Sequence, residues 1–128
     1  MPLIGIDYGE KRIGVALSDE GKSFAFPYSV VANDKNAVRE IKKICEKNKV
    51  EKIILGQSLN YSNQPNPVMK KIELFKDSLK KEIKLPVIYQ TETLTTQEAR
   101  RTQGDIEKID ASAAALILRS FIEKENIL

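Results

Sequence analysis

The chain has 128 residues, of which 41% are hydrophobic and 30% are charged, and its formal net charge is +3. This composition is typical of one folded domain covering residues 1–128, and it does not indicate disorder. The single cysteine excludes an internal disulfide and a multi-cysteine zinc site, and the absence of histidine excludes Ser-His-Asp and Cys-His nucleophile systems. Any chemistry must therefore depend on carboxylates, lysine, tyrosine or metal ions held by oxygen ligands.

The sequence also bears on where the protein works. No apolar run approaches the roughly 20 residues of a membrane-spanning helix. Met1 leads straight into an apolar strand pattern, without the features of a signal peptide. We therefore expect a cytoplasmic protein that does not contact a membrane. The small positive charge favours a polyanionic partner such as nucleic acid but does not establish one.

Two short apolar runs at the start of the chain flank a polar turn. These runs, residues 3–6 and 13–17, are rich in β-branched side chains, and Gly9 lies between them, which predicts a β-hairpin. Asp7 closes the first run, where a strand interior favours another apolar residue. Because burying an unpaired carboxylate costs several kcal/mol, Asp7 needs a cation, a donor cluster or a metal ion. An ordinary turn-capping aspartate is the alternative.

The middle of the chain alternates strand and helix patterns. Residues 23–31 alternate aromatic and smaller side chains, which predicts a third strand. Asn33-Asp34 supplies the predicted N-cap of a helix that ends near Asn48, and Cys45 falls on the apolar face of that helix, in the core. Residues 51–55 predict a short buried strand. Two apolar strands separated by a helix indicate a parallel, right-handed crossover.

The second half continues this alternation. A polar loop over residues 56–67 precedes a helix that ends near Ile83 and carries one core-facing apolar stripe. The outer face of this helix is rich in lysine: Lys70, Lys71, Lys76, Lys80, Lys81 and Lys84. Residues 86–92 predict a fifth strand, and Thr95 caps a predicted short helix. After a polar break at 103–108, a final helix is predicted from Asp110 to Lys124, with small residues at its start that allow close approach to the sheet.

The predicted order of elements is βββαβαβα. Three strands paired in sequence, followed by two strands reached through helices, make a mixed five-stranded sheet with helices on both faces. This α/β arrangement is ribonuclease H-like. Fold alone does not decide function.

Three acidic residues mark the ends of predicted elements. Asp7 ends the first strand, Glu92 ends the fifth, and Asp110 begins the last helix. Sites in open α/β sheets form outside the carboxyl ends of parallel strands, so these acids can converge at one edge. Their mutual repulsion calls for a divalent cation, and oxygen ligands suit Mg²⁺ or Mn²⁺. Two such ions about 4 Å apart can activate a water and stabilise the leaving oxygen of a phosphodiester. Separately, Glu92 also fits a polar strand end, and Asp110 an N-cap.

Four ordered blocks of the sequence carry a family pattern. They are residues 5–16 (GIDYGEKRIGVA), 54–56 (ILG), 92–99 (ETLTTQEA) and 110–118 (DASAAALIL). With these blocks the chain closely resembles, over essentially its whole length, the YqgF family of Holliday-junction-resolvase-like proteins. Members of that family are also described as nucleases of the 16S ribosomal RNA precursor.

The resemblance implies a ribonuclease H-like fold and a metal-dependent nuclease that matures the 5′ end of the 16S precursor in the bacterial cytoplasm. The family's acidic triad falls on Asp7, Glu92 and Asp110, which we expect to be catalytic residues and ligands of two Mg²⁺ or Mn²⁺ ions. The expected partner is nucleic acid, and precursor ribosomal RNA is expected ahead of branched DNA. The ribosome or its precursor is a further expected partner. We expect a monomer or a weak dimer. Residues expected to bind substrate are Lys11, Arg12, Asn60, Arg100 and Arg101.

Two departures from the family pattern bear on these expectations. Thr91 and Thr93 flank Glu92 where the family usually has an acid and a base, which affects a fourth metal ligand or an orienting ion pair. The loop over residues 57–65 differs from the usual Leu-Pro-Leu and Gly-Thr pattern, which affects contacts with the substrate.

Other functions fit parts of the sequence. The alternatives are a Holliday junction resolvase acting on branched DNA and a non-catalytic RNA-binding factor for ribosome assembly. The Ile-Asp-Tyr-Gly turn also resembles the first phosphate loop of actin and sugar-kinase ATPases, which need two such domains. Sequence-specific DNA binding is disfavoured, because the sequence contains no helix-turn-helix pattern and no evident aromatic stacking platform.

Overall fold

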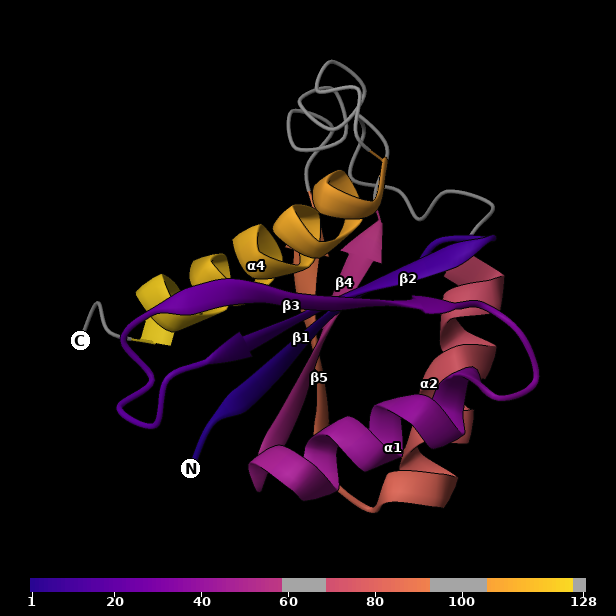
Figure 1. Ribbon diagram of the computed structural model, residues 1–128, viewed down its shortest axis with the longest axis horizontal. Coiled ribbons are helices and arrows are strands. Elements are labelled where there is room, and N and C mark those ends of the chain that lie inside the picture. The colour runs from indigo at the N-terminus through magenta and orange to yellow at the C-terminus, as the bar shows by residue number, and fades with distance from the viewer. Residues whose placement is uncertain (59–68, 93–105, 126–128) are drawn as a thin grey trace.

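The structure is a computed structural model that describes residues 1–58, 69–92 and 106–125 (Figure 1). The strands are β1 (Leu3–Asp7), β2 (Arg12–Ser18), β3 (Ala25–Ala32), β4 (Lys52–Ser58) and β5 (Val87–Glu92). The helices are α1 (Ala37–Asn48), α2 (Met69–Ile83) and α4 (Ile106–Glu125). This order confirms the predicted βββαβαβα arrangement. The predicted short helix after Thr95 lies outside the described residues.

The five strands form one mixed sheet in the order β3-β2-β1-β4-β5. The first three strands are antiparallel neighbours, whereas β4 is parallel to β1 and β5 is parallel to β4. The central strand is therefore β1, and its end is flanked by strands on both sides. This topology confirms the predicted hairpin, the parallel crossovers and the ribonuclease H-like arrangement.

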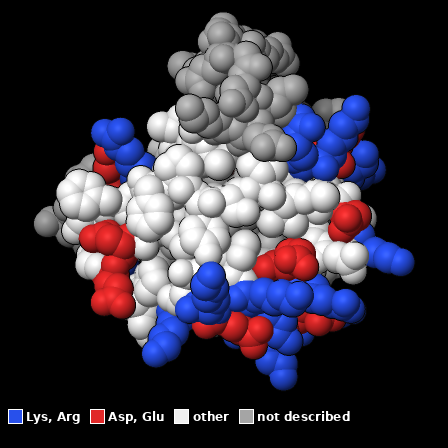
Figure 2. All heavy atoms as spheres, in the orientation of Figure 1, with Lys and Arg blue, Asp and Glu red and all other residues white. Residues whose placement is uncertain are grey.

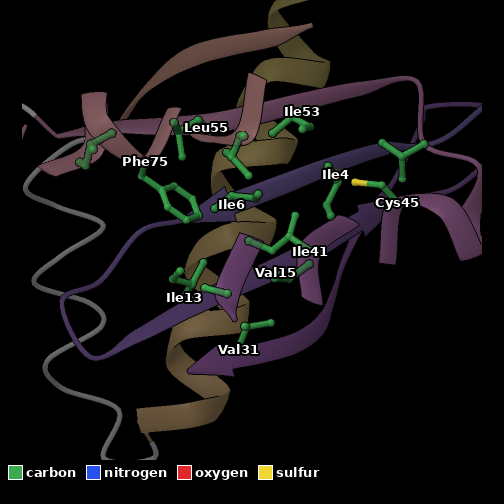
Figure 3. Packing of buried hydrophobic residues seen from close by; sticks show 14 of the residues in the cluster. Ile4, Ile6, Ile13, Val15, Val31, Ile41, Cys45, Ile53, Leu55 and Phe75 are labelled. Atoms are coloured by element: carbon green, nitrogen blue, oxygen red, sulfur yellow. The ribbon is translucent and has the colours of Figure 1, made fainter. Parts of the chain in front are cut away.

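Helices cover both faces of the sheet, as predicted. On one face, α1 and α2 enclose a cluster of buried side chains that includes Ile4 and Ile6 from β1, Ile41 from α1 and Phe75 from α2 (Figure 3). On the other face, α4 packs Ala114, Leu118 and its later apolar residues against the sheet. The predicted apolar stripes of α2 and α4 thus form the two halves of the core. Within the described ranges, no helix has both the length and the apolarity to cross a membrane.

Cys45 lies in the core, as predicted. Its side chain is buried on α1 within the cluster under α1 and α2. Burial raises the pKa of the Cys45 thiol to about 12, and the neighbouring charge of Glu46 adds to this shift.

The predicted N-cap of α1 is wrong. The helix begins at Ala37, and its N-cap residue is Asn36, whose side chain makes no capping hydrogen bond. Asp34 instead accepts a hydrogen bond from the backbone N–H of Asn36 through Oδ1, at 2.8 Å. The side chain of Asn33 is used elsewhere, in the β1–β2 turn described below. Asp34 therefore shapes the turn before the helix, whereas the Asn33 side chain stabilises a different turn.

Two predicted boundaries were also wrong. Strand β4 continues past Gly56 to Ser58, because its parallel pairing with β5 continues as far as Glu92. Helix α4 begins at Ile106, so the end of the predicted polar break is helical and Asp110 is the fifth residue of the helix. The ordinary interpretation of Asp110 as an N-cap is therefore excluded.

Candidate active site

Asp7 is a buried carboxylate at the end of the central strand. Only 2% of the residue is exposed. Its strand is hydrogen-bonded to β2 on one side, where Asp7 pairs with Gly14, and to β4 on the other. The backbone on either side therefore fixes the position of this acid, as a catalytic or metal-binding group requires.

The turn that follows Asp7 is tightly packed. A Cβ atom on Gly9 would clash with the carbonyl oxygen of Arg12, so only glycine fits this turn without a shift of the backbone. Asn33, which follows β3, stabilises the turn with two hydrogen bonds. Its Nδ2 donates to the carbonyl oxygen of Gly9 at 2.7 Å, and its backbone N–H donates to the carbonyl oxygen of Lys11 at 3.0 Å. The chain after β3 thus supports the turn beside Asp7.

Helix α2 packs against the same turn. The ring of Tyr8, the residue after Asp7, lies 5.1 Å from the ring of Phe75, centroid to centroid, in a tilted arrangement. On the surface, Nζ of Lys71 lies 3.3 Å from Oε1 of Glu10. The aromatic pair anchors the turn to the core, whereas the exposed ion pair contributes little to stability.

Helix α4 approaches β1 closely enough to need glycine. A Cβ atom on Gly5 would lie 2.9 Å from the carbonyl oxygen of Ala114 and 2.8 Å from Cβ of Leu118. At the other end of β1, far from Asp7, Leu3 and Ile122 line one pocket. The helix therefore runs antiparallel to β1, with its first turns on the side of Asp7. Position 110 lies one helical turn before Ala114. It is therefore nearer than Ala114 to the edge of the sheet where Asp7 lies.

Position 92 lies at the same edge. Glu92 is the last residue of β5 and is in register with Ser58 at the end of β4. Because β1, β4 and β5 are parallel, the ends of all three strands share one edge of the sheet. For Glu92 and Asp110 the structure describes the backbone position, and for Asp7 the side chain as well. The fold thus brings the three predicted acid positions to one edge.

The predicted substrate-binding residues divide into two groups. Lys11 and Arg12 are described: Lys11 is exposed in the turn after Asp7, and Arg12 is half-buried at the start of β2. Asn60, Arg100 and Arg101 lie outside the described residues. The lysines of α2 are exposed, except that half-buried Lys76 lies over the ring of Tyr89, 4.4 Å from its centroid.

A family model described as "RuvX: Holliday junction resolvase" matches residues 1–124. The chain belongs to the RuvX family. This membership confirms the resemblance to YqgF, which is another name for the family. Two relatives, each named "Putative pre-16S rRNA nuclease", come from Clostridium tetani and Caldanaerobacter subterraneus subsp. tengcongensis. The first is 34% identical and the alignment covers 96% of both chains; the second is 31% identical, with 98% and 99% covered.

Solved structures show the same fold as this RuvX family member. RuvC from T. thermophilus in complex with a Holliday junction substrate has a TM-score of 0.63 at 15% identity, with 98% of this chain and 96% of that chain covered. The fowlpox virus Holliday junction resolvase has a TM-score of 0.55 at 17% identity, with 97% and 99% covered. At this identity the likeness confirms the ribonuclease H-like fold and carries no further conclusion.

Sequence reasoning missed two residues at the candidate site of this RuvX family member. Asn33 supports the turn after Asp7, and Tyr8 links that turn to α2. Both contacts join segments far apart in the chain, so local patterns could not reveal them. An asparagine directly after a strand was the only sequence signal for Asn33, and it equally fits a helix cap.

Proposed function

We propose that the chain is a metal-dependent nuclease that hydrolyses phosphodiester bonds in RNA. Its proposed substrate is the precursor of 16S ribosomal RNA, which it cleaves during maturation of the 5′ end. The observation that carries the proposal is the placement of positions 7, 92 and 110 at one edge of the sheet. Membership of the RuvX family and the names of its relatives support the reaction and the substrate.

The donor set of this edge fits hard divalent cations. Carboxylate oxygens are the ligands that Mg²⁺ and Mn²⁺ prefer. A nearby cation stabilises the charged form of a carboxylate as buried as Asp7. We assign Asp7, Glu92 and Asp110 as the ligands of two such ions. When bound, the ions lower the pKa of a coordinated water and stabilise charge on the leaving oxygen.

The chain's own residues position the reacting groups. In hydrolysis, a water oxygen forms a bond to phosphorus, the bond to the departing oxygen breaks, and that oxygen takes up a proton. Strand β1, paired on both sides, keeps Asp7 in place, and the turn held by Asn33 presents Lys11 and Arg12 to phosphates. Asn60, Arg100 and Arg101 are proposed to contact the substrate as well.

The proposal extends to setting and assembly. We propose that residues 1–128 form one nuclease domain that works in the cytoplasm as a monomer or weak dimer. Its partners are precursor ribosomal RNA and the ribosomal particle that contains this RNA. The names of the relatives support this setting, because the 16S precursor is the substrate that those names state.

A second candidate is cleavage of branched DNA. The description of the RuvX family as Holliday junction resolvase favours it. The acid positions serve either substrate, because both reactions are phosphodiester hydrolysis. A non-catalytic RNA-binding role in ribosome assembly is the third possibility, and it predicts no cleavage with any metal.

A nuclease assay separates these candidates. Precursor 16S RNA and a four-way DNA junction are each incubated with the protein in Mn²⁺ and in chelator. The proposal predicts metal-dependent cleavage of the RNA that Asp7→Asn abolishes and Glu10→Gln retains, because Glu10 is an exposed acid in the same turn. Cleavage of the junction alone would establish the second candidate. Cleavage by Asp7→Asn at the wild-type rate would overturn the site.

A further inference from the structure

Three exposed aromatic side chains lie at the start of β3 or directly before it. Phe24, directly before the strand, is 73% exposed, Phe26 is 44% exposed and Tyr28 is 38% exposed. No aromatic stacking platform is evident in the sequence, because the pattern of β3 alone does not show whether its aromatic side chains are buried. These side chains are exposed because β3 is an edge strand, paired with β2 alone. Exposed aromatic groups gathered on one element indicate an interaction surface.

One of these aromatic residues, Tyr28, lies beside the end of α1. Phe26 pairs with Leu17, whose side chain belongs to the core cluster under α1 and α2. The hydroxyl of Tyr28 accepts a hydrogen bond from Nδ2 of Asn48, the last residue of α1, at 3.4 Å. Tyr28 therefore borders the C-terminal turn of α1, and Phe26 lies on the face of the sheet that α1 covers. We refer to Phe24, Phe26 and Tyr28 as the aromatic row.

Helix α1 carries net positive charge, whereas the acid Asp19 lies beside Phe24 and accepts a hydrogen bond from its backbone N–H. Strand β3 itself has no charged residue, whereas α1 carries four basic residues against two acidic ones. The basic residues of α1 are Arg39, Lys42, Lys43 and Lys47. Figure 2 shows an uncharged band across this face; below it, where α1 lies in Figure 1, Lys and Arg are gathered together with some Asp and Glu. Stacking surfaces beside cationic side chains are the combination that binds single-stranded nucleic acid.

We propose that the aromatic row stacks the unpaired bases of single-stranded RNA, while basic residues of α1 contact its phosphates. This inference rests on the proposed function, because it assigns the row to the single-stranded flank of the RNA that is cleaved. The far end of β3 pairs Ala32 with Arg12, beside the turn after Asp7. Eight strand residues extend roughly 25 Å, so β3 can lead a strand of RNA from the candidate site to the row.

The outer strand β3 is poorly suited to pairing with a strand of a second protein chain. Pro27 lies within β3 and has no N–H to donate, and the β2–β3 register shifts between Val15 and Ala16. Prolines and bulges are the features that prevent pairing at sheet edges. Stacking of bases uses side chains and needs no backbone donors.

Binding of an unstructured RNA oligonucleotide tests the proposal directly. The measurement is fluorescence anisotropy of labelled RNA in chelator, so that no cleavage interferes. We expect Phe26→Leu and Tyr28→Leu each to weaken binding roughly five- to tenfold, because leucine keeps apolar surface but removes stacking. Leu74→Ala is the control, because Leu74 is 69% exposed on α2. A blunt RNA duplex should bind the variants and the wild type equally.

A spectroscopic variant covers the case in which the leucine variants fold poorly. The chain has no tryptophan, so Phe26→Trp introduces a single indole reporter. Stacking predicts that RNA quenches its fluorescence. Unchanged affinity of the folded leucine variants, or an unquenched indole at saturating RNA, would overturn the proposal. Loss of self-association in sedimentation, with RNA affinity intact, would instead assign the row to a second copy of the chain. These outcomes are independent of nuclease activity, which the Asp7→Asn assay tests separately.

Discussion

Gly5 of β1 lies directly beneath Ala114 of α4, and a Cβ atom on Gly5 would lie 2.9 Å from the carbonyl oxygen of Ala114. This contact sets how closely the helix that carries Asp110 approaches the strand that carries Asp7. Gly5→Ala should therefore push α4 away from the sheet and lower the free energy of unfolding by about 1–3 kcal/mol. Denaturant titration measures this change.

Gly21→Ala is the matched control for that experiment. A Cβ atom on Gly21 meets its nearest neighbour, Oδ2 of Asp19, at 3.4 Å, which is ordinary contact. The control should be as stable as the wild type. Equal stability of Gly5→Ala and Gly21→Ala would contradict the close packing of α4 on β1.

Asn33→Ala tests the support of the turn after Asp7. The substitution removes the hydrogen bond from Nδ2 to the carbonyl oxygen of Gly9 and should cost about 0.5–1.5 kcal/mol in unfolding free energy. Asn36→Ala should cost less, because the Asn36 side chain makes no capping hydrogen bond. Nuclease activity of Asn33→Ala, measured where the variant is fully folded, should also fall. A larger loss of stability for Asn36→Ala would mean that our assignment of the two asparagines is wrong.

Much of the fold follows from patterns that the sequence displays openly. The apolar runs around Gly9 predict the hairpin, and the apolar stripes predict α2 and α4, because burial of these faces is the main driving force of folding. The errors arose where tertiary contacts override local preference. Asn33 resembles a helix cap but bonds to a turn 24 residues earlier in the chain. Asp110 resembles a cap, yet α4 begins four residues before it.

The candidate site was predictable only in part. The backbone positions of Asp7, Glu92 and Asp110 follow from the strand order, because parallel strands end at one edge. Metal binding by these acids stays a prediction. The exposed aromatic row on β3 could not be predicted, because period-two alternation does not reveal which strand lies at the sheet edge.

Cys45 predicts how stability responds to alkaline pH. The folded-state pKa of its thiol is raised from 9.0 to about 12, so the folded chain binds this proton more tightly than the unfolded chain. Its contribution to stability is complete below about pH 9 and is lost as the pH rises toward 12, by up to about 1.4 kcal/mol per pH unit. Cys45→Ala lacks this titration. Denaturant titrations between these pH values should show a flatter loss of stability for the variant, and parallel curves would contradict the burial of the thiol.

The salt dependence of RNA binding tests the basic residues expected to bind substrate. Replacing Arg100 and Arg101 with alanine should reduce the slope of log affinity against log salt by roughly 0.7–0.9 for each phosphate that the protein no longer neutralises. Lys84→Ala is the control, since Lys84 lies just after α2, at the opposite end of that helix from the Lys71–Glu10 pair. If Lys84→Ala changes the slope and replacement of the two arginines does not, the phosphate contacts lie on or near α2.

The central claim is that Asp7, Glu92 and Asp110 together bind divalent metal. Thermal melts in chelator and in Mn²⁺ test it most directly, with wild type, Asp7→Asn, Glu92→Gln, Asp110→Asn and the control Glu10→Gln. At ten times the dissociation constant, Mn²⁺ should stabilise the wild type and the control by about 1.4 kcal/mol, which raises Tm by several degrees. Each of the three site variants should lose most of this rise, and Asp7→Asn in chelator should be at least as stable as the wild type, because one negative charge is removed from the cluster. A full metal response in Asp7→Asn, together with lower stability in chelator, would contradict the claim and make Asp7 a structural residue.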